Sequence, residues 1–193
     1  LCQLAEIFNG ISVNTPSLSA IIAIILAGLL LLASGFASAS EIAFFSLSPS
    51  DLNDIEEGNH PSDGKISNLL ADSERLLATI LITNNFVNVT IIMLCNFFFM
   101  NVFVFHSPLA EFLILTVILT FLLLLFGEIM PKIYSAQKTL AFCRFSAPVI
   151  YVLRKVFAPI SAVLVHSTAF LNKHFAKKNH NISVDELSHA LEL

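Results

Sequence analysis

The sequence predicts an all-α membrane protein with three transmembrane helices and additional juxtamembrane amphipathic helices. Hydrophobic residues make up 56% of its 193 residues, and the mean hydropathy is +0.82. Charged residues account for only 12%, against about a quarter in soluble domains. Three uncharged stretches each approach or exceed the roughly 20 apolar residues that a helix needs to cross a bilayer.

The first predicted span covers residues 18 to about 39. It is dense in Ile and Leu, and it becomes small and polar from Ala33 to Ser40. Small residues in a membrane helix permit either close contact with a neighbouring helix or a local break. The sequence alone leaves both outcomes open.

The second predicted span lies between Arg75 and Glu111. Residues 76–110 carry no formal charge. Because this stretch is longer than one straight span, we expect part of it to project from the membrane. The preceding residues 48–74 form an acidic loop, in which Pro49 begins a turn or a helix.

The third predicted span runs from Pro108, a favourable first helical residue, to Gly127. We expect the helix to end or break there, since Pro131 lacks the N–H that would continue it. Carbonyl groups near Gly127 are then free beside the carboxylate of Glu128. An ionisable residue within a span indicates a functional site.

Residues 142–172 are apolar but interrupted, and neither half reaches spanning length. The interruptions are Pro148, Arg154, Lys155 and Pro159. We expect two short helices along the inner membrane face, with their cations among the lipid headgroups. Further on, Ser183 and Glu186 have the spacing of a capping box, which predicts the start of another helix.

The distribution of basic residues predicts the orientation. Eight of the ten Lys and Arg residues follow Glu128, and such residues accumulate on the cytoplasmic side. We therefore expect the N-terminus outside and the C-terminus in the cytoplasm. The acidic loop over residues 48–74 is then cytoplasmic as well, because acidic residues carry little weight in this rule.

Composition and spacing argue against several classes of function. The net charge is −4, and the basic residues do not suggest a nucleic-acid partner. The cysteines Cys2, Cys95 and Cys143 have no metal-binding or redox spacing. An enzyme is not expected. An intramembrane protease would need an Asp pair within the spans or a His beside Ser38 or Ser40, and the sequence offers neither.

Polar side chains within the spans supply hard oxygen donors. Ser34 and Ser38 are four residues apart and share one face of the first helix, and Ser40 follows them. The second helix carries three amides, which we expect to face the bundle interior, because an unpaired amide in hydrocarbon costs about 1–3 kcal/mol. These amides are Asn84, Asn85 and Asn88.

With the Gly127 carbonyl and the Glu128 carboxylate, this set suits Mg²⁺ or Ca²⁺ and not copper or zinc. Other roles stay open for its members. A serine in a membrane helix commonly bonds its own i−4 carbonyl, and the amides could equally hold helices together. Glu41 is expected to be a paired or interfacial charge, and Asn96 to serve packing.

Three blocks of sequence resemble the transmembrane domain of the CorC/CNNM family. They are SGFASASEIA at 34–43, LLATILITNNFVN at 76–88 and GEIMPK at 127–132. Together the blocks are specific, whereas none of them is specific alone. The resemblance covers residues 18–176 and implies a homodimer of three-span subunits in a bacterial inner membrane, exporting Mg²⁺ in exchange for Na⁺. The sequence departs from the family pattern at Ala39, where many relatives have Gly.

The same resemblance implies a ligand set and a domain plan. The Mg²⁺ ligands carried over by motif are Ser34, Ser38, Asn88, the Gly127 carbonyl and Glu128, with Asn84 close by and Ser40 as a further candidate. Residues 1–17 would be extracytoplasmic, and residues 177–193 would begin a cytosolic helical linker toward paired CBS domains. Residues 183–193 also resemble the gliding-motility-associated, GldE-like branch found in Bacteroidetes.

Two functions are compatible with these residues. The preferred one is a Mg²⁺ transporter, in which several ligands act together because Mg²⁺ gives up its water reluctantly. The alternative is a non-transporting membrane scaffold or assembly factor for a motility or secretion machine, in which the polar residues only join helices. Dependence on metal would separate the two.

Overall fold

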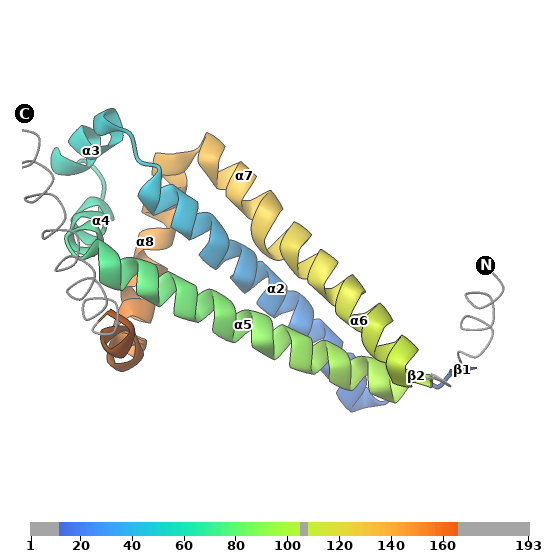
Figure 1. Cartoon of the computed structure of the whole chain (residues 1–193). Coiled ribbons are helices and arrows are strands. Elements are labelled where there is room, and N and C mark those ends of the chain that lie inside the picture. The colour runs from blue at the N-terminus through green and yellow to red at the C-terminus, as the bar shows by residue number, and fades with distance from the viewer. Residues whose placement is uncertain (1–11, 105–107, 166–193) are drawn as a thin grey trace, which may run out of the picture.

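Three long helices lie side by side and form most of the molecule (Figure 1). The computed structural model describes residues 12–104 and 108–165. Within these residues, three helices are long and apolar enough to cross a membrane: Leu18–Phe45, Ser73–Val102 and Glu111–Gln137. The prediction of an all-helical protein with three spans is thereby confirmed.

The elements follow one another along the chain with short connections. The first half contains β1 (Ser12–Val13), α2 (Leu18–Phe45), α3 (Pro49–Glu56), α4 (Asp63–Leu70) and α5 (Ser73–Val102). The second half contains β2 (Phe103–Val104), α6 (Pro108–Leu122), the π-helix η1 (Leu123–Ile129), α7 (Met130–Gln137) and α8 (Thr139–Val156). The two strands pair antiparallel at one end of the bundle, and α3, α4 and α8 gather at the other (Figure 1).

Helix α2 lies between α5 on one side and η1 and α7 on the other (Figure 1). It runs without a break through residues 33–40, most of which are buried. Close helix contact is therefore the outcome of the small-residue segment, and Ala39 lies inside a continuous helix. The contact between α2 and α7 is closest at Gly35, where an added Cβ atom would lie only 2.9 Å from Cγ of Pro131.

The third span continues past the point where we expected it to end. The elements α6, η1 and α7 follow one another without interruption over residues 108–137. The backbone becomes a π-helix over residues 123–129, after which the Met130 N–H bonds the Leu125 carbonyl, five residues back. This change of register places Pro131 in the first turn of α7, where a missing N–H is tolerated, so the proline does not end the helix.

Helix α8 also passes a proline that we expected to interrupt it. Pro148 lies within α8, and its neighbours Ala147 and Ile150 are fully buried in a hydrophobic cluster that holds the helix in place. The break comes instead at Phe157. Pro159 then lies in the first turn of the next helix, a position that proline favours.

The two helices at this break form an angle of 79°. Thr139–Val156 and Ala158–Val165 are apolar enough, taken together, to count as one bent span, so the described residues contain three spans, or four with this pair. That this region stays on one side of the membrane remains a prediction. Residues 166–193, with the helix predicted from the capping box, lie outside the described residues.

Buried apolar side chains form two clusters. One joins α3, α4 and α8 to the adjoining ends of α2 and α5, and it includes Phe44, Leu69 and Ile150. The other lies within the bundle and includes Ala27 and Val87. Outside these clusters many large apolar side chains on the long helices are exposed, which is the surface that a lipid bilayer covers.

Candidate functional site

Three oxygen atoms from two helices meet where α2 packs on α5. The hydroxyl oxygen of Ser34, which is fully buried, lies 2.9 Å from Oδ1 of Asn84 and 2.6 Å from Oδ1 of Asn88. A hydroxyl carries one proton, so Ser34 can donate fully to only one of the two amide oxygens at a time. In this contact one amide oxygen is therefore left without the Ser34 proton, and a bound cation would occupy it.

Gly127 brings the third span to the same point. A Cβ atom at this position would lie 3.1 Å from the hydroxyl oxygen of Ser34 and 3.5 Å from Cδ1 of Leu31. Because glycine has no Cβ, the π-helix can approach α2 closely here. Glu128 follows directly and is half-buried, and its side chain makes no hydrogen bond or ion pair to other described residues.

Ser38 lies one helical turn beyond Ser34 on α2 and is also fully buried. Its hydroxyl oxygen has no hydrogen-bond partner among residues 12–104 and 108–165. A buried hydroxyl without a partner costs about 1–3 kcal/mol. This oxygen is therefore available to a ligand.

Two of the predicted polar residues turn away from this cluster. The Ser40 hydroxyl donates to the Phe36 carbonyl at 2.7 Å, which is the i−4 bond common for serine in helices. Asn85 is exposed and its Nδ2 donates to the Leu81 carbonyl at 2.9 Å, so the expectation that it faces the interior was wrong. One residue step turns a helix by about 100°, and Asn85 therefore cannot share the face of Asn84.

Two contacts that sequence reasoning missed fix α7 against α2. The buried Ser135 hydroxyl donates to the Ala39 carbonyl at 2.7 Å. Nζ of Lys132 lies 2.9 Å from Oε2 of Glu41, and both side chains are about one-third exposed. Glu41 is thus a paired charge. Lys132 and Glu41 are 91 positions apart, and no local spacing in the sequence indicates their pairing across the two helices.

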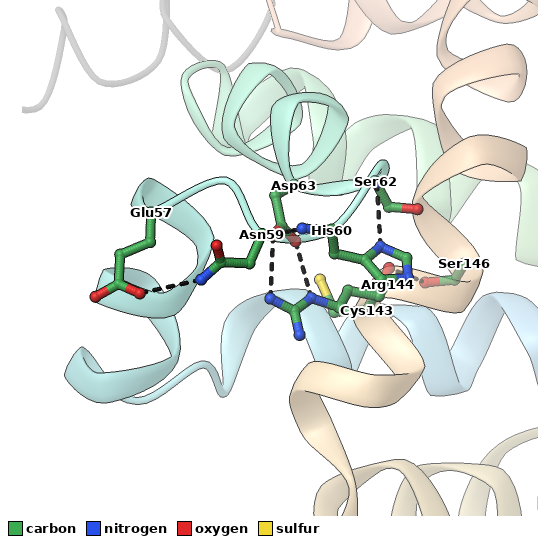
Figure 2. A network of polar contacts seen from close by, with 8 residues as sticks. All are labelled: Glu57, Asn59, His60, Ser62, Asp63, Cys143, Arg144 and Ser146. Carbon is green, nitrogen blue, oxygen red and sulfur yellow. Dashed lines mark hydrogen bonds and ion pairs between the residues drawn. The ribbon is translucent and has the colours of Figure 1, made fainter.

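A separate polar network joins α4 to α8 at the end of the molecule away from the strands (Figure 2). The fully buried Asp63 carboxylate accepts two bonds from Arg144, from Nε at 2.8 Å and from Nη2 at 3.1 Å. The backbone N–H of His60 donates to Asp63 at 2.9 Å. The hydrogen-bonded guanidinium of Arg144 is the main reason that the pKa of Asp63 lies below its usual value. This network holds two elements together.

The residues around Ser34 fit a hard cation. No group of three or more His, Cys, Asp or Glu side chains that could hold a metal occurs in the part of the chain that the structure describes. A metal bound there would depend on neutral oxygens around one carboxylate. Ser34 and the two amides supply neutral oxygens of the kind that Mg²⁺ prefers, with Ser38 one turn away on α2 and Glu128 next to Gly127.

Comparison with known proteins gives a consistent result. The family model of the cyclin M transmembrane N-terminal domain, CNNM, matches residues 24–193. A UPF0053 protein of Haemophilus influenzae (strain Rd) is 32% identical to this chain over 130 residues. That match covers 67% of this chain and 30% of the relative, so the chain spans less than a third of the relative's length.

Proposed function

Because this chain belongs to the CNNM transmembrane domain family, we propose that it is a Mg²⁺ transporter that exports Mg²⁺ in exchange for Na⁺. The family is associated with Mg²⁺ transport, and the chain is a multi-pass membrane protein. In this proposal a dehydrated Mg²⁺ binds between α2, α5 and η1. The protein moves an ion and catalyses no chemical reaction.

The contact of Ser34 with two amide oxygens carries the proposal. Three oxygens within hydrogen-bond distance share one proton. Mg²⁺ takes about six oxygen ligands at about 2.0–2.1 Å. Oxygens that are already 2.6–2.9 Å apart reach that arrangement with small movements, and the ion removes the excess of acceptors.

The proposed ligands differ in what they contribute. Glu128 supplies the only negative charge, and Ser38 supplies a buried oxygen that has no other described partner. The Gly127 carbonyl is suitable because Gly127 lies in the π-helix η1 directly against the Ser34 hydroxyl, where a Cβ would be only 3.1 Å away. Asn88 and Ser34 complete the set with Asn84 beside them. Ser40 is omitted, since its hydroxyl bonds its own helix.

The resemblance to the family supports further parts of the proposal. We infer a homodimer in a bacterial inner membrane, with residues 177–193 leading to cytosolic CBS domains. The N-terminus faces outward, on the strength of the eight basic residues that follow Glu128. The gliding-motility-associated branch rests on residues 183–193 alone.

The test is thermal stabilisation of the purified protein by Mg²⁺. A ligand that binds only the folded state stabilises it by RT ln(1 + [L]/Kd), about 2.7 kcal/mol at 100 times Kd. We expect Glu128→Gln to abolish this stabilisation. The substitution keeps the shape of the side chain but removes its negative charge, so the positive charge of Mg²⁺ would be unbalanced in a low-dielectric environment. Asn88→Ala should weaken it, since only one neutral ligand is lost.

Two matched controls sharpen this test. Asn85→Ala removes an amide three residues from Asn88 that is exposed and bonded to its own helix, so Mg²⁺ stabilisation should stay at the wild-type level. Glu74→Gln removes an exposed carboxylate at the start of α5 and should also have no effect. If Glu128→Gln retained wild-type stabilisation and Mg²⁺ transport in liposomes, the transporter proposal would fall and the scaffold alternative would replace it.

A further inference from the structure

A second polar region lies between α5 and α6, toward the end of the bundle that carries β1 and β2 (Figure 1). Here the two helices leave an open groove of about 340 Å³ between them. Most of its lining is apolar, but four polar side chains enter it: Asn96, Glu111, Thr116 and Thr120. Asn96 follows Asn88 by eight residues, which places it about 12 Å farther along α5 from the Ser34 cluster.

The polar groups of this groove differ from other exposed polar groups on α5. Asn85, Thr90 and Asn101 each bond the carbonyl four residues back, which satisfies them without a partner. The four side chains of the groove make no hydrogen bond or ion pair with any residue in the described part of the chain. Within the described residues their polar atoms are thus without a hydrogen-bond partner, and this includes Asn96, for which we expected packing from the sequence.

Free polar groups in a membrane span are costly unless they bind water or a ligand. One carboxylate among an amide and two hydroxyls presents one negative charge and several neutral oxygens. This composition attracts a cation and offers little to an anion, since no Lys, Arg or His lines the groove among residues 12–104 and 108–165. The set also differs from the Ser34 cluster, where both amide oxygens lie within 3 Å of the Ser34 hydroxyl oxygen.

The size of the groove favours an ion that keeps its water. A water molecule occupies about 30 Å³ in the liquid, so an octahedral shell of six takes about 180 Å³, well within the groove. Mg²⁺ commonly binds through one or two carboxylates while it retains several waters. We infer that this groove is a second cation site, which holds a hydrated Mg²⁺ with Glu111 as its anion and with Asn96, Thr116 and Thr120 bonded to its water.

This inference extends the proposed function and rests on it for the identity of the ion. A transporter that strips Mg²⁺ at its centre must also return the ion to water at the end of the path. A groove with one carboxylate and free hydrogen-bonding groups holds the ion at that step. It concentrates hydrated Mg²⁺ beside the bundle without requiring its dehydration.

Hexaamminecobalt(III) tests the site because its ammonia ligands do not exchange. The complex resembles hydrated Mg²⁺ in size and cannot enter a dehydrated site. We expect the full chain, in nanodiscs of zwitterionic lipid, to bind it in calorimetric titrations. Glu111→Gln should raise the Kd for the complex by at least about tenfold, which corresponds to a loss of about 1.4 kcal/mol in binding free energy. Thr116→Val should weaken it less, because only one hydrogen bond to the shell is lost.

Three control variants separate this site from other sources of binding. Thr90→Val removes a hydroxyl that bonds its own helix, and Glu74→Gln removes an exposed acid elsewhere, so both should bind the complex like the wild type. Glu128→Gln should also bind it normally while it loses Mg²⁺ stabilisation. Failure of the central site would thus leave the groove intact, and the two proposals can fail independently.

The folded state of Glu111→Gln is checked by its Mg²⁺-dependent thermal stabilisation, which should persist through the central site. Wild-type affinity of Glu111→Gln for hexaamminecobalt(III) would overturn the inference. Absence of binding to the wild-type chain would overturn it as well. Equal weakening in Glu111→Gln and Glu74→Gln would show a nonspecific attraction to acidic residues, and the groove would not be a site.

Discussion

At the scale of single residues, the centre of the bundle brings the helices close together at Gly127 and leaves buried oxygen atoms without a full set of hydrogen-bond donors. Gly127 removes a Cβ that would lie 3.1 Å from the Ser34 hydroxyl oxygen, and that hydroxyl faces two amide oxygens with one proton. Ser38 adds a buried oxygen without a described partner. A site built for helix packing alone would satisfy these groups internally. Their surplus of oxygens is what a dehydrated cation needs.

Asp63 gives a prediction about pH. Its pKa lies below the usual 3.8, mainly because of the bond from Arg144. A carboxyl with a lowered folded-state pKa contributes its full stability above the unfolded value, and loses it as the pH falls through the lower folded value. We expect Asp63→Asn to reduce the melting temperature at pH 7 by roughly 5 °C. The difference from the wild type should shrink as the pH falls below 3.8.

Glu56→Gln is the matched control for this prediction, because it neutralises an exposed acid in the neighbouring helix α3. Its melting temperature should follow that of the wild type at every pH. A difference between Asp63→Asn and the wild type that stayed constant down to pH 3 would contradict a role for the charge of Asp63. Thermal unfolding followed by circular dichroism measures all three proteins.

Part of this site could be predicted from residues alone. The spacing of four residues places Asn84 with Asn88 and Ser34 with Ser38, because helix geometry is local and regular. The same geometry turns Asn85 about 100° away from Asn84, so its exposure also follows from local spacing, whereas tertiary packing decides which face of the helix meets a neighbour. Asp63 and Arg144 are 81 positions apart in the sequence, and no local pattern predicts that they pair.

At the scale of elements, the π-helix determines how the third span meets α2. Hydropathy predicted the span, but not its passage through Pro131, because the effect of a proline depends on the register of the turn before it. In η1 the register lengthens by one residue and the helix continues. π-type turns often occur at functional sites. Here the turn contains both Gly127 and Glu128, which are proposed ligands.

Gly35 tests the contact between α2 and this segment. A Cβ atom there would lie 2.9 Å from Cγ of Pro131 and 3.3 Å from the Phe126 carbonyl, and neither a proline ring nor a backbone can yield easily. We expect Gly35→Ala to destabilise the protein by about 1–3 kcal/mol. Because Ser34 and Gly127 lie beside this contact, Mg²⁺-dependent stabilisation should weaken as well.

Gly28→Ala is the control, since it makes the same substitution in the same helix where nothing lies within 4 Å. It should leave stability unchanged or raise it by up to about 1 kcal/mol, through helix propensity. Equal unfolding midpoints for the two variants in denaturant titrations would mean that α2 does not require close contact with Pro131.

At the scale of the whole molecule, the two ends of the bundle differ in charge and architecture. One end has only the short strand pair, and the other carries α3, α4 and α8 (Figure 1). Lys65 and the basic residues of α7 and α8 all belong to the second end. Since basic residues accumulate on the cytoplasmic side, the end with α3, α4 and α8 is predicted to face the cytoplasm.

Cysteine labelling tests this orientation and the number of spans together. In a chain whose native cysteines are replaced, we expect Asn14→Cys to react with a membrane-impermeant maleimide from outside, because it lies at the strand end and is exposed. Asn59→Cys, exposed between α3 and α4, should react only after permeabilisation. Lys178→Cys should behave like Asn59→Cys if α8 and the helix after it stay on one side, because one crossing separates the strand end from Asn59 and three crossings separate it from Lys178. Reaction of Lys178→Cys from outside, with Asn59→Cys still protected, would mean that the bent pair Thr139–Val156 and Ala158–Val165 is a fourth span. Protection of Asn14→Cys with free reaction of Asn59→Cys would reverse the orientation and place the groove at Glu111 on the cytoplasmic side.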